Sequence, residues 1–179
     1  MYRRRRARRR WIGGWVLVFA AAVLFWLDRQ GGLLYAGADG TRYDGQRFRV
    51  VAVVDGDTVD LGVGDGGKPT TRVRLWGIDT PEVGRRGQRS EPGADDATDR
   101  VRVLALGQTV TVSLEPHRIR DRYGRLLAFL ELPDGSVLNE KLLIEGLAHS
   151  DGRWPHRHVE RYARLQEQAE FEGRGLWAD

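Results

Sequence analysis

The sequence predicts a small closed β-barrel of five strands with about three flanking α-helices, an α+β domain that follows an apolar N-terminal segment. Five short stretches predict strands, four of them because they are β-branched or alternate apolar and polar residues with a period of two. Three other segments carry apolar residues at helical spacing. The order of three strands, one helix, two strands and two helices favours a barrel with helices packed around it.

The strands differ in their patterns. We expect them at residues 47–54, 58–61, 71–76, 109–114 and 126–132. The first is a β-branched apolar run, and the next three alternate. A glycine-rich turn separates the second strand from the third, and Pro133-Asp134-Gly135 ends the fifth.

The helices are marked by their ends. We expect them at residues 94–106, 136–145 and 156–172. The second begins at the capping residue Ser136 and stops at Gly146. The third follows Pro155 and stops at Gly173, as helices commonly begin and end.

The composition limits the possible functions. The chain has 179 residues, of which 41% are hydrophobic, so it can bury a core. It has no cysteine, which excludes disulfides, thiolate metal sites and cysteine nucleophiles. The net charge is +4, but seven of the 29 basic residues lie within residues 1–10. The remainder holds 22 basic and 25 acidic side chains, so its net charge gives no argument for nucleic-acid binding.

The N-terminal segment is typical of a membrane anchor. Residues 11–27 carry no charge and would span about 26 Å as a helix, near the lower limit for crossing a bilayer. Because the arginines precede this segment, the positive-inside rule puts residues 1–10 in the cytoplasm and the domain outside. The predicted organisation is a basic tail at 1–10, a transmembrane anchor at 11–27, a linker at 28–45 and a domain at 46–179.

A cleaved signal peptide is the alternative. Ala36-Gly37-Ala38 has the small-x-small form of a cleavage site, although it lies far from the end of the apolar run. The domain is then either anchored to the membrane and extracytoplasmic, which we favour, or secreted after cleavage.

Three polar motifs follow strands. They are Asp55-Gly56-Asp57-Thr58, Asp79-Thr80-Pro81-Glu82 and Asp121-Arg122-Tyr123-Gly124-Arg125. Each alone could be an ordinary turn, because the chain has several other Asp-Gly pairs. Asp55 and Asp57, two residues apart at a strand end, would point to the same side and offer oxygen ligands to a hard cation. Arg74 and Asp79 are five residues apart, so they converge only if the chain bends or bulges between them.

Together the motifs contain what phosphodiester cleavage requires. A cation polarises a phosphoryl oxygen, arginines neutralise the charge that grows on the phosphorus centre, and a carboxylate takes the proton of the attacking water. The histidines add no metal pattern, since His156 and His158 are two residues apart near a helix start.

In these motifs the chain resembles the staphylococcal nuclease (thermonuclease) family, from about Phe48 to Trp177. The resemblance implies an OB-fold barrel and Ca²⁺-dependent hydrolysis of DNA and RNA that leaves 3′-phosphate ends. It implies that Asp57, Asp79 and the carbonyl of Thr80 bind Ca²⁺, that Glu82 is the general base and that Arg74 and Arg125 bind the phosphate. It also implies that Tyr123 lies beside the nucleotide.

Some positions depart from the family's pattern. A lysine often found before the tyrosine is Arg122 here, and residues 150–154 contain no tyrosine, which leaves Trp154 as the nearest aromatic. We expect Arg122, Tyr123 and Trp154 to contact the substrate. The loop at residues 83–93 has its own sequence, so the preference between DNA and RNA stays open.

Two other functions are compatible with this fold. A non-catalytic barrel could bind single-stranded nucleic acid at the cell envelope, and a purely structural envelope protein could carry the same anchor. The complete set of acids and arginines favours the nuclease. We expect a monomer with no protein partner, acting on DNA or RNA.

Overall fold

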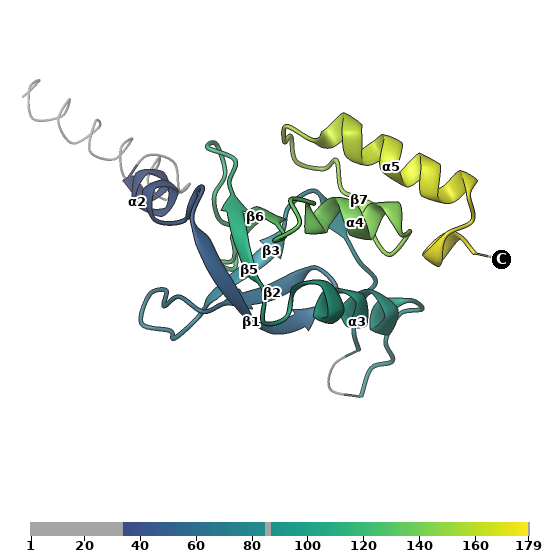
Figure 1. Cartoon of the computed structure of the whole chain (residues 1–179), viewed down its shortest axis with the longest axis horizontal. Helices are drawn as coiled ribbons and strands as arrows, with labels where there is room; N and C mark the ends of the chain where they lie inside the picture. The colour runs from purple at the N-terminus through teal and green to yellow at the C-terminus, as the bar shows by residue number, and fades with distance from the viewer. Residues whose placement is uncertain (1–33, 85–86, 179) are drawn as a thin grey trace, which may run out of the picture.

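The computed structural model describes residues 34–84 and 87–178. Five strands close a barrel in the order β1-β2-β3-β6-β5, with β5 returning to β1 (Figure 1). The pairs are antiparallel, apart from the parallel pair β3 and β6. The strands are β1 (Arg47–Asp55), β2 (Thr58–Leu61), β3 (Thr71–Leu75), β5 (Thr109–Ser113) and β6 (Leu126–Glu131). The predicted five-stranded barrel is therefore confirmed.

The three predicted helices are also present. They are α3 (Ala94–Ala105), α4 (Leu138–Ile144) and α5 (Val159–Phe171). Helix α3 packs against β1 and α4, while α4 also packs against β6 and α5. A bidentate ion pair joins Arg100 of α3 to Glu145 after α4, with both distances 2.6 Å.

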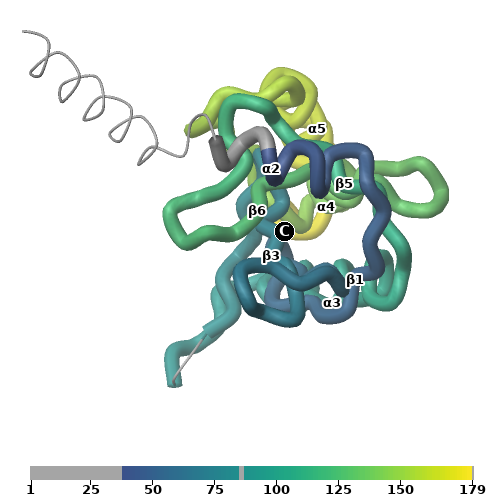
Figure 2. Tube along the Cα trace, turned by 90° about the vertical axis from the view of Figure 1, so that its left-hand side faces the viewer, coloured from purple at the N-terminus to yellow at the C-terminus, as the bar shows by residue number. Residues whose placement is uncertain are grey.

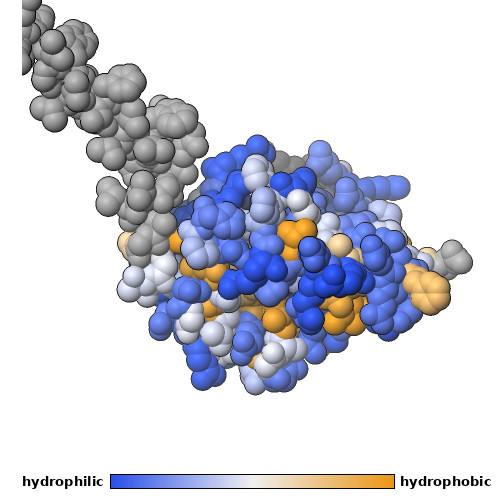
Figure 3. Space-filling view, turned by 90° about the horizontal axis from the view of Figure 1, so that it is seen from above, coloured by the Kyte–Doolittle hydropathy of each residue, from blue (hydrophilic) through white to orange (hydrophobic). Residues whose placement is uncertain are grey.

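The core fills the barrel and the space under the helices. Its larger buried side chains include Val59, Leu61, Leu75, Leu126, Leu130, Leu138 and Leu142. The surface seen in Figure 3 is mostly hydrophilic, with small hydrophobic patches between the hydrophilic residues. This contrast between interior and surface is what the strand alternation predicts.

A helix stands where the sequence predicted a linker. Helix α2 (Leu34–Tyr43) leads into β1, so the prediction of a linker over 28–45 was wrong for these residues (Figure 2). Two glycines weaken its intrinsic helical preference, and tertiary contacts compensate. Tyr43 is fully buried, and its hydroxyl lies 3.0 Å from Oγ1 of Thr71. The folded domain therefore begins before residue 46.

The tail at 1–10 and the apolar segment at 11–27 lie outside the described residues. Among the residues that are described, no helix is long and apolar enough to cross a membrane.

The second polar motif begins in one of two short paired strands. Strand β4 (Ile78–Asp79) pairs with β7 (His149–Ser150), and a 3₁₀ helix (Gly175–Trp177) ends the chain. Gly77 has a φ of +78°, which turns the chain between β3 and β4. This turn is the bend that the spacing of Arg74 and Asp79 required.

Candidate active site

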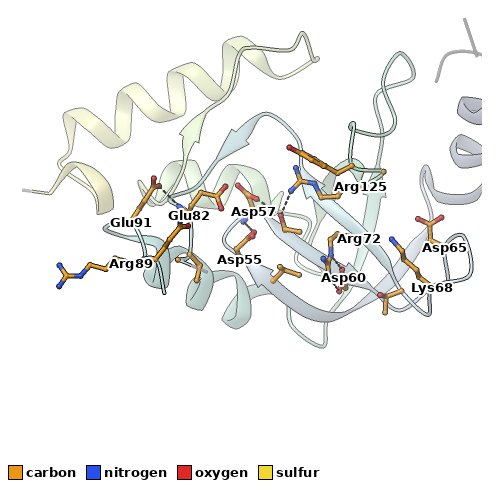
Figure 4. A pocket seen from close by; sticks show the side chains of 18 residues that line it. Asp55, Asp57, Asp60, Asp65, Lys68, Arg72, Glu82, Arg89, Glu91 and Arg125 are labelled. Atoms are coloured by element: carbon orange, nitrogen blue, oxygen red, sulfur yellow. Dashed lines mark hydrogen bonds and ion pairs between the residues drawn. The ribbon is translucent and has the colours of Figure 1, made fainter. Parts of the chain in front are cut away.

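A pocket of about 930 Å³ opens beside the turn from β1 to β2 (Figure 4). Its walls come from this turn, from the loop after β4 and from the hairpin before β6. The charged residues that line it are Asp55, Asp57, Asp60, Asp65, Lys68, Arg72, Glu82, Arg89, Glu91 and Arg125. All three polar motifs of the sequence therefore reach this pocket.

Asp57 is at the centre of the hydrogen-bond network beside the pocket. Its side chain is nearly buried, and its Oδ1 accepts a hydrogen bond from the hydroxyl of Thr58 at 3.0 Å. Its Oδ2 accepts one from the backbone N–H of Thr80 at 3.2 Å. Asp55 also lines the pocket, as its spacing from Asp57 predicted. A Cβ on Gly56 would lie 2.7 Å from Oγ1 of Thr80, so this turn packs closely against the second motif.

Arg74 joins the two carboxylates that the sequence singled out. Its Nη1 lies 2.7 Å from Oδ2 of Asp57, and its Nη2 lies 2.6 Å from Oδ1 of Asp79. Its Nη1 also donates to the carbonyl of Ile78 at 2.8 Å. Arg74 and Asp79 therefore converge, because the turn at Gly77 bends the chain between them. Arg153 lies 3.2 Å from the other oxygen of Asp79, so arginines contact both oxygens of that carboxylate.

Burial changes the acidity of Asp57. Desolvation raises the pKa of Asp57 to about 6. The positive charge of Arg74 acts in the opposite direction, and the negative charge of Asp55 adds to the increase. A carboxylate with a raised pKa in a polar pocket is a feature of functional sites.

Arg125 is held by the first residue of its own hairpin. Asp121 accepts hydrogen bonds from Nε of Arg125 at 2.7 Å and from the backbone N–H groups of Tyr123 and Arg125, each at 2.9 Å. Nη1 of Arg125 lies 3.4 Å from Oγ1 of Thr58. The hairpin therefore presents Arg125 to the pocket beside Asp57, in the orientation seen in Figure 4.

Glu82 extends into the same pocket from the loop after β4. Its backbone N–H donates to Oε2 of Glu91 at 2.8 Å, and the N–H of Glu91 donates to the carbonyl of Glu82 at 3.0 Å. The two ends of the loop are thus fixed to each other. Both glutamates are exposed, so Glu82 can reach solvent water.

The residues fit a hard cation in part. In the described part of the chain, no three His, Asp or Glu side chains form a group that could hold a metal ion. Two carboxylates nevertheless converge, because Asp57 and Asp79 both contact the single guanidinium of Arg74. With the carbonyl of Thr80 they would make an all-oxygen set of donors, which suits Ca²⁺.

Two predicted substrate contacts lie outside the pocket lining. Arg122 contacts the ring of its neighbour Tyr123, which does line the pocket. Trp154 packs against the guanidinium of Arg118, 3.7 Å from the ring centroid, and half of its surface stays exposed. The structure thus brings four predicted site residues together at the pocket: Asp57, Glu82, Tyr123 and Arg125. The other three lie beside the pocket, because Asp57 contacts Thr80 and Arg74, and Arg74 contacts Asp79.

The sequence analysis did not assign a role to several supporting residues. Asp121 was named within the third motif, and its role could have been found, since an aspartate commonly caps backbone N–H groups two residues later in a turn. Glu91 and Arg153 lie in irregular segments with no periodic signal, and their roles depend on how these segments return to the site.

The chain resembles known proteins over most of its length. The model of the family described as "Staphylococcal nuclease homologue" matches residues 72–179, more than half of the chain. The chain belongs to the staphylococcal nuclease family. The predicted enzyme class is thereby confirmed, and the chain is a nuclease of the thermonuclease family.

Individual family members resemble most of the chain. A thermonuclease of Staphylococcus hyicus is 29% identical over 170 residues, covering 93% of this chain and 96% of the relative. A thermonuclease of Staphylococcus intermedius is 31% identical, covering 88% and 89%. An uncharacterized endonuclease of Escherichia coli is 36% identical, covering 73% and 76%. The similarity to the first two nucleases begins before the matched family region, since it covers nearly the whole chain.

Proposed function

We propose that this nuclease hydrolyses phosphodiester bonds of DNA or RNA in a Ca²⁺-dependent reaction that leaves 3′-phosphate ends. The observation that carries the proposal is the presence of Asp57, Glu82 and Arg125 in one pocket, with Arg74 bridging Asp57 to Asp79. The family's activity and the names of the relatives support the same reaction.

The carboxylates and arginines have different tasks in this mechanism. Asp57, Asp79 and the carbonyl of Thr80 would hold Ca²⁺, which supplies Lewis-acid polarisation of a phosphoryl oxygen when bound. Glu82 accepts the proton of the attacking water, because its exposed carboxylate reaches both pocket and solvent.

The arginines stabilise the charge that grows on the phosphoryl oxygens. Arg125 reaches the pocket directly, and Asp121 fixes its Nε so that its Nη atoms remain for the phosphate. Arg74 contacts Asp57 and Asp79, so its guanidinium lies at the carboxylates that would hold the cation and adds a second positive charge there for the phosphate. Tyr123 lies at the pocket edge and offers a ring for the sugar or base.

The charge of the pocket supports the dependence on a cation. Six acidic and four basic side chains line it, so without a cation its lining carries a net negative charge. Such a pocket repels a polyanion, and one divalent cation offsets the difference. Cation and substrate should therefore bind cooperatively.

Two arginine variants test this assignment of roles. In Arg125→Lys and Arg74→Lys the charge stays but the bidentate geometry is lost, so kcat/KM for a DNA oligonucleotide should fall by about 10²–10³. Arg161→Lys is the matched control, because Arg161 makes a bidentate pair with Glu140 outside the pocket. Equal kinetics in all three variants would contradict the proposed roles.

We also propose that residues 11–27 anchor the enzyme with its domain outside the cytoplasm. The candidate cleavage site at residues 36–38 lies within helix α2, and the next residue, Asp39, is nearly buried in the domain. A signal peptidase would cleave an extended, exposed segment more readily than this helix, so the position of the site favours an uncleaved anchor. Membranes washed with alkaline carbonate should retain the full-length enzyme, whereas release of a shortened chain into the medium would support the secreted alternative.

A further inference from the structure

Arg120 connects helix α2 to two walls of the pocket. Its Nε and Nη2 donate to Asp39 of α2 at 2.6 and 3.1 Å, and its Nη1 and Nη2 donate to Asp65 at 2.6 and 3.1 Å. Nη1 also donates to the carbonyl of Gly124 at 2.8 Å. We call these four residues the Arg120 junction.

The Arg120 junction is shielded from solvent. The side chain of Arg120 is 16% exposed, that of Asp39 10% and that of Asp65 24%. Hydrogen bonds to Asp39 raise the pKa of Arg120, and those to Asp65 add to this effect, so its charge is firmly held. Charge-assisted bidentate pairs of this kind fix geometry more firmly than exposed ion pairs.

Two members of the Arg120 junction are pocket residues. Asp65 lies in the loop between β2 and β3, and Gly124 lies at the tip of the hairpin that carries Arg125. The residue after Arg120 is Asp121, which holds Arg125 by its Nε and backbone N–H. Arg120 therefore fixes the start of this hairpin, because it is the residue before Asp121, and the tip of the hairpin, because it donates a hydrogen bond to Gly124.

Helix α2 supports the junction from the outside. Tyr43 is fully buried, and the guanidinium of Arg120 lies 5.8 Å from the centroid of its ring. Arg42 donates to the carbonyl of Gly64, in the same loop as Asp65. The helix thus contacts the β2–β3 loop directly and the Arg125 hairpin through Arg120.

We propose that Arg120 is a positioning residue, and that helix α2 acts through it to keep the β2–β3 loop and the Arg125 hairpin in the geometry that binds the substrate phosphate. This inference rests on the proposed role of Arg125. Loss of Arg120 leaves the carboxylates of Asp39 and Asp65 facing each other, and their repulsion separates α2 from the loop. Loss of Asp39 frees α2 but keeps the Arg120–Asp65 pair.

The test uses the full chain in mild detergent, with the variants Arg120→Gln and Asp39→Ala. Its first readout is hydrogen exchange of peptides that cover residues 63–70 and 121–125. Exchange in both segments should become at least about tenfold faster in Arg120→Gln and accelerate less in Asp39→Ala. The second readout is the kinetics of DNA cleavage, where KM should rise about tenfold in Arg120→Gln and kcat should change less.

Arg100→Gln is the matched control, since it breaks a bidentate pair between α3 and Glu145 outside the pocket. It should lower stability without accelerating exchange at residues 121–125. Exchange and KM in Arg120→Gln that match this control would overturn the proposal. If Arg120→Gln does not fold, unchanged exchange at 121–125 in Asp39→Ala overturns it. If the wild type cleaves no nucleic acid, the exchange readout still decides about the junction, while the proposed function fails separately.

Discussion

Glu82 and Glu91 form two hydrogen bonds across one loop, one through the side chain of Glu91 and one through its backbone. Oε2 of Glu91 accepts the N–H of Glu82 at 2.8 Å, and the carbonyl of Glu82 accepts the N–H of Glu91 at 3.0 Å. Both side chains line the pocket. The position of the proposed general base therefore depends on a carboxylate nine residues later in the chain.

Removing this carboxylate should misplace Glu82. We expect Glu91→Ala to lower kcat by about 10–100-fold, because an error of about 1 Å in a catalytic group costs this much. Glu91→Gln keeps a carbonyl oxygen that can accept the N–H of Glu82, so it should retain most of the activity. Single-turnover cleavage of labelled DNA measures both. If glutamine and alanine reduce kcat equally, the hydrogen bond is not what positions Glu82.

Gly77 should be required for stability. Its φ of +78° strains any other residue, and a Cβ there would lie 2.5 Å from Nε2 of His156. We expect Gly77→Ala to lower the free energy of unfolding by about 2–4 kcal/mol, as the sum of backbone strain and overpacking. Urea unfolding measures this loss.

Gly135 provides the control, because its φ is +80° and a Cβ added there would meet no atom of the described residues within 4 Å. Gly135→Ala should therefore cost only the backbone strain, about 1–2 kcal/mol. Equal losses in the two variants would show that the contact with His156 contributes nothing.

His156 should make stability fall in weak acid. Burial lowers the pKa of His156 below its usual 6.5. His156 therefore binds a proton less readily in the native state than in the unfolded chain. Its Nδ1 also accepts the N–H of His158 at 3.2 Å and cannot do so when protonated. The free energy of unfolding should therefore decrease as the pH falls below 6.5.

Other groups titrate in this range, and the raised pKa of Asp57 acts with the opposite sign. The difference between wild type and His156→Phe, measured by urea unfolding at each pH from about 7.5 to about 5, isolates His156. The wild type should lose stability relative to the variant as the pH falls. A constant difference would rule out this effect of His156.

The barrel and the central residues of the site could be predicted because their signals are local. Three of the predicted strands alternate and the first is a β-branched apolar run, and the three acid-containing motifs each follow a strand. The bend between Arg74 and Asp79 could also be expected, because residues an odd number of positions apart face opposite sides of a regular strand. Gly77 provides this bend.

What could not be predicted depends on contacts between distant segments. Helix α2 contains two glycines, and Asp39 is stabilised by Arg120, 81 residues later. Strands β4 and β7 have two residues each, too few for a periodic pattern. Glu91 lies in a loop without periodicity, and its partner is defined only when the loop closes. In each case tertiary contacts, and not local preference, determine the structure.

In the proposed mechanism Glu82 acts as the base in a Ca²⁺-dependent cleavage. The most direct test of this mechanism incubates the full chain and Glu82→Gln with 5′-labelled single-stranded DNA, in Ca²⁺ or in excess chelator, and treats the products with a phosphatase that removes 3′-phosphates. We expect products in Ca²⁺ whose gel mobility changes after phosphatase treatment, none in chelator, and cleavage about 10²–10⁴-fold slower in Glu82→Gln. Cleavage that persists in chelator, or that proceeds equally fast without the Glu82 carboxylate, would contradict the mechanism.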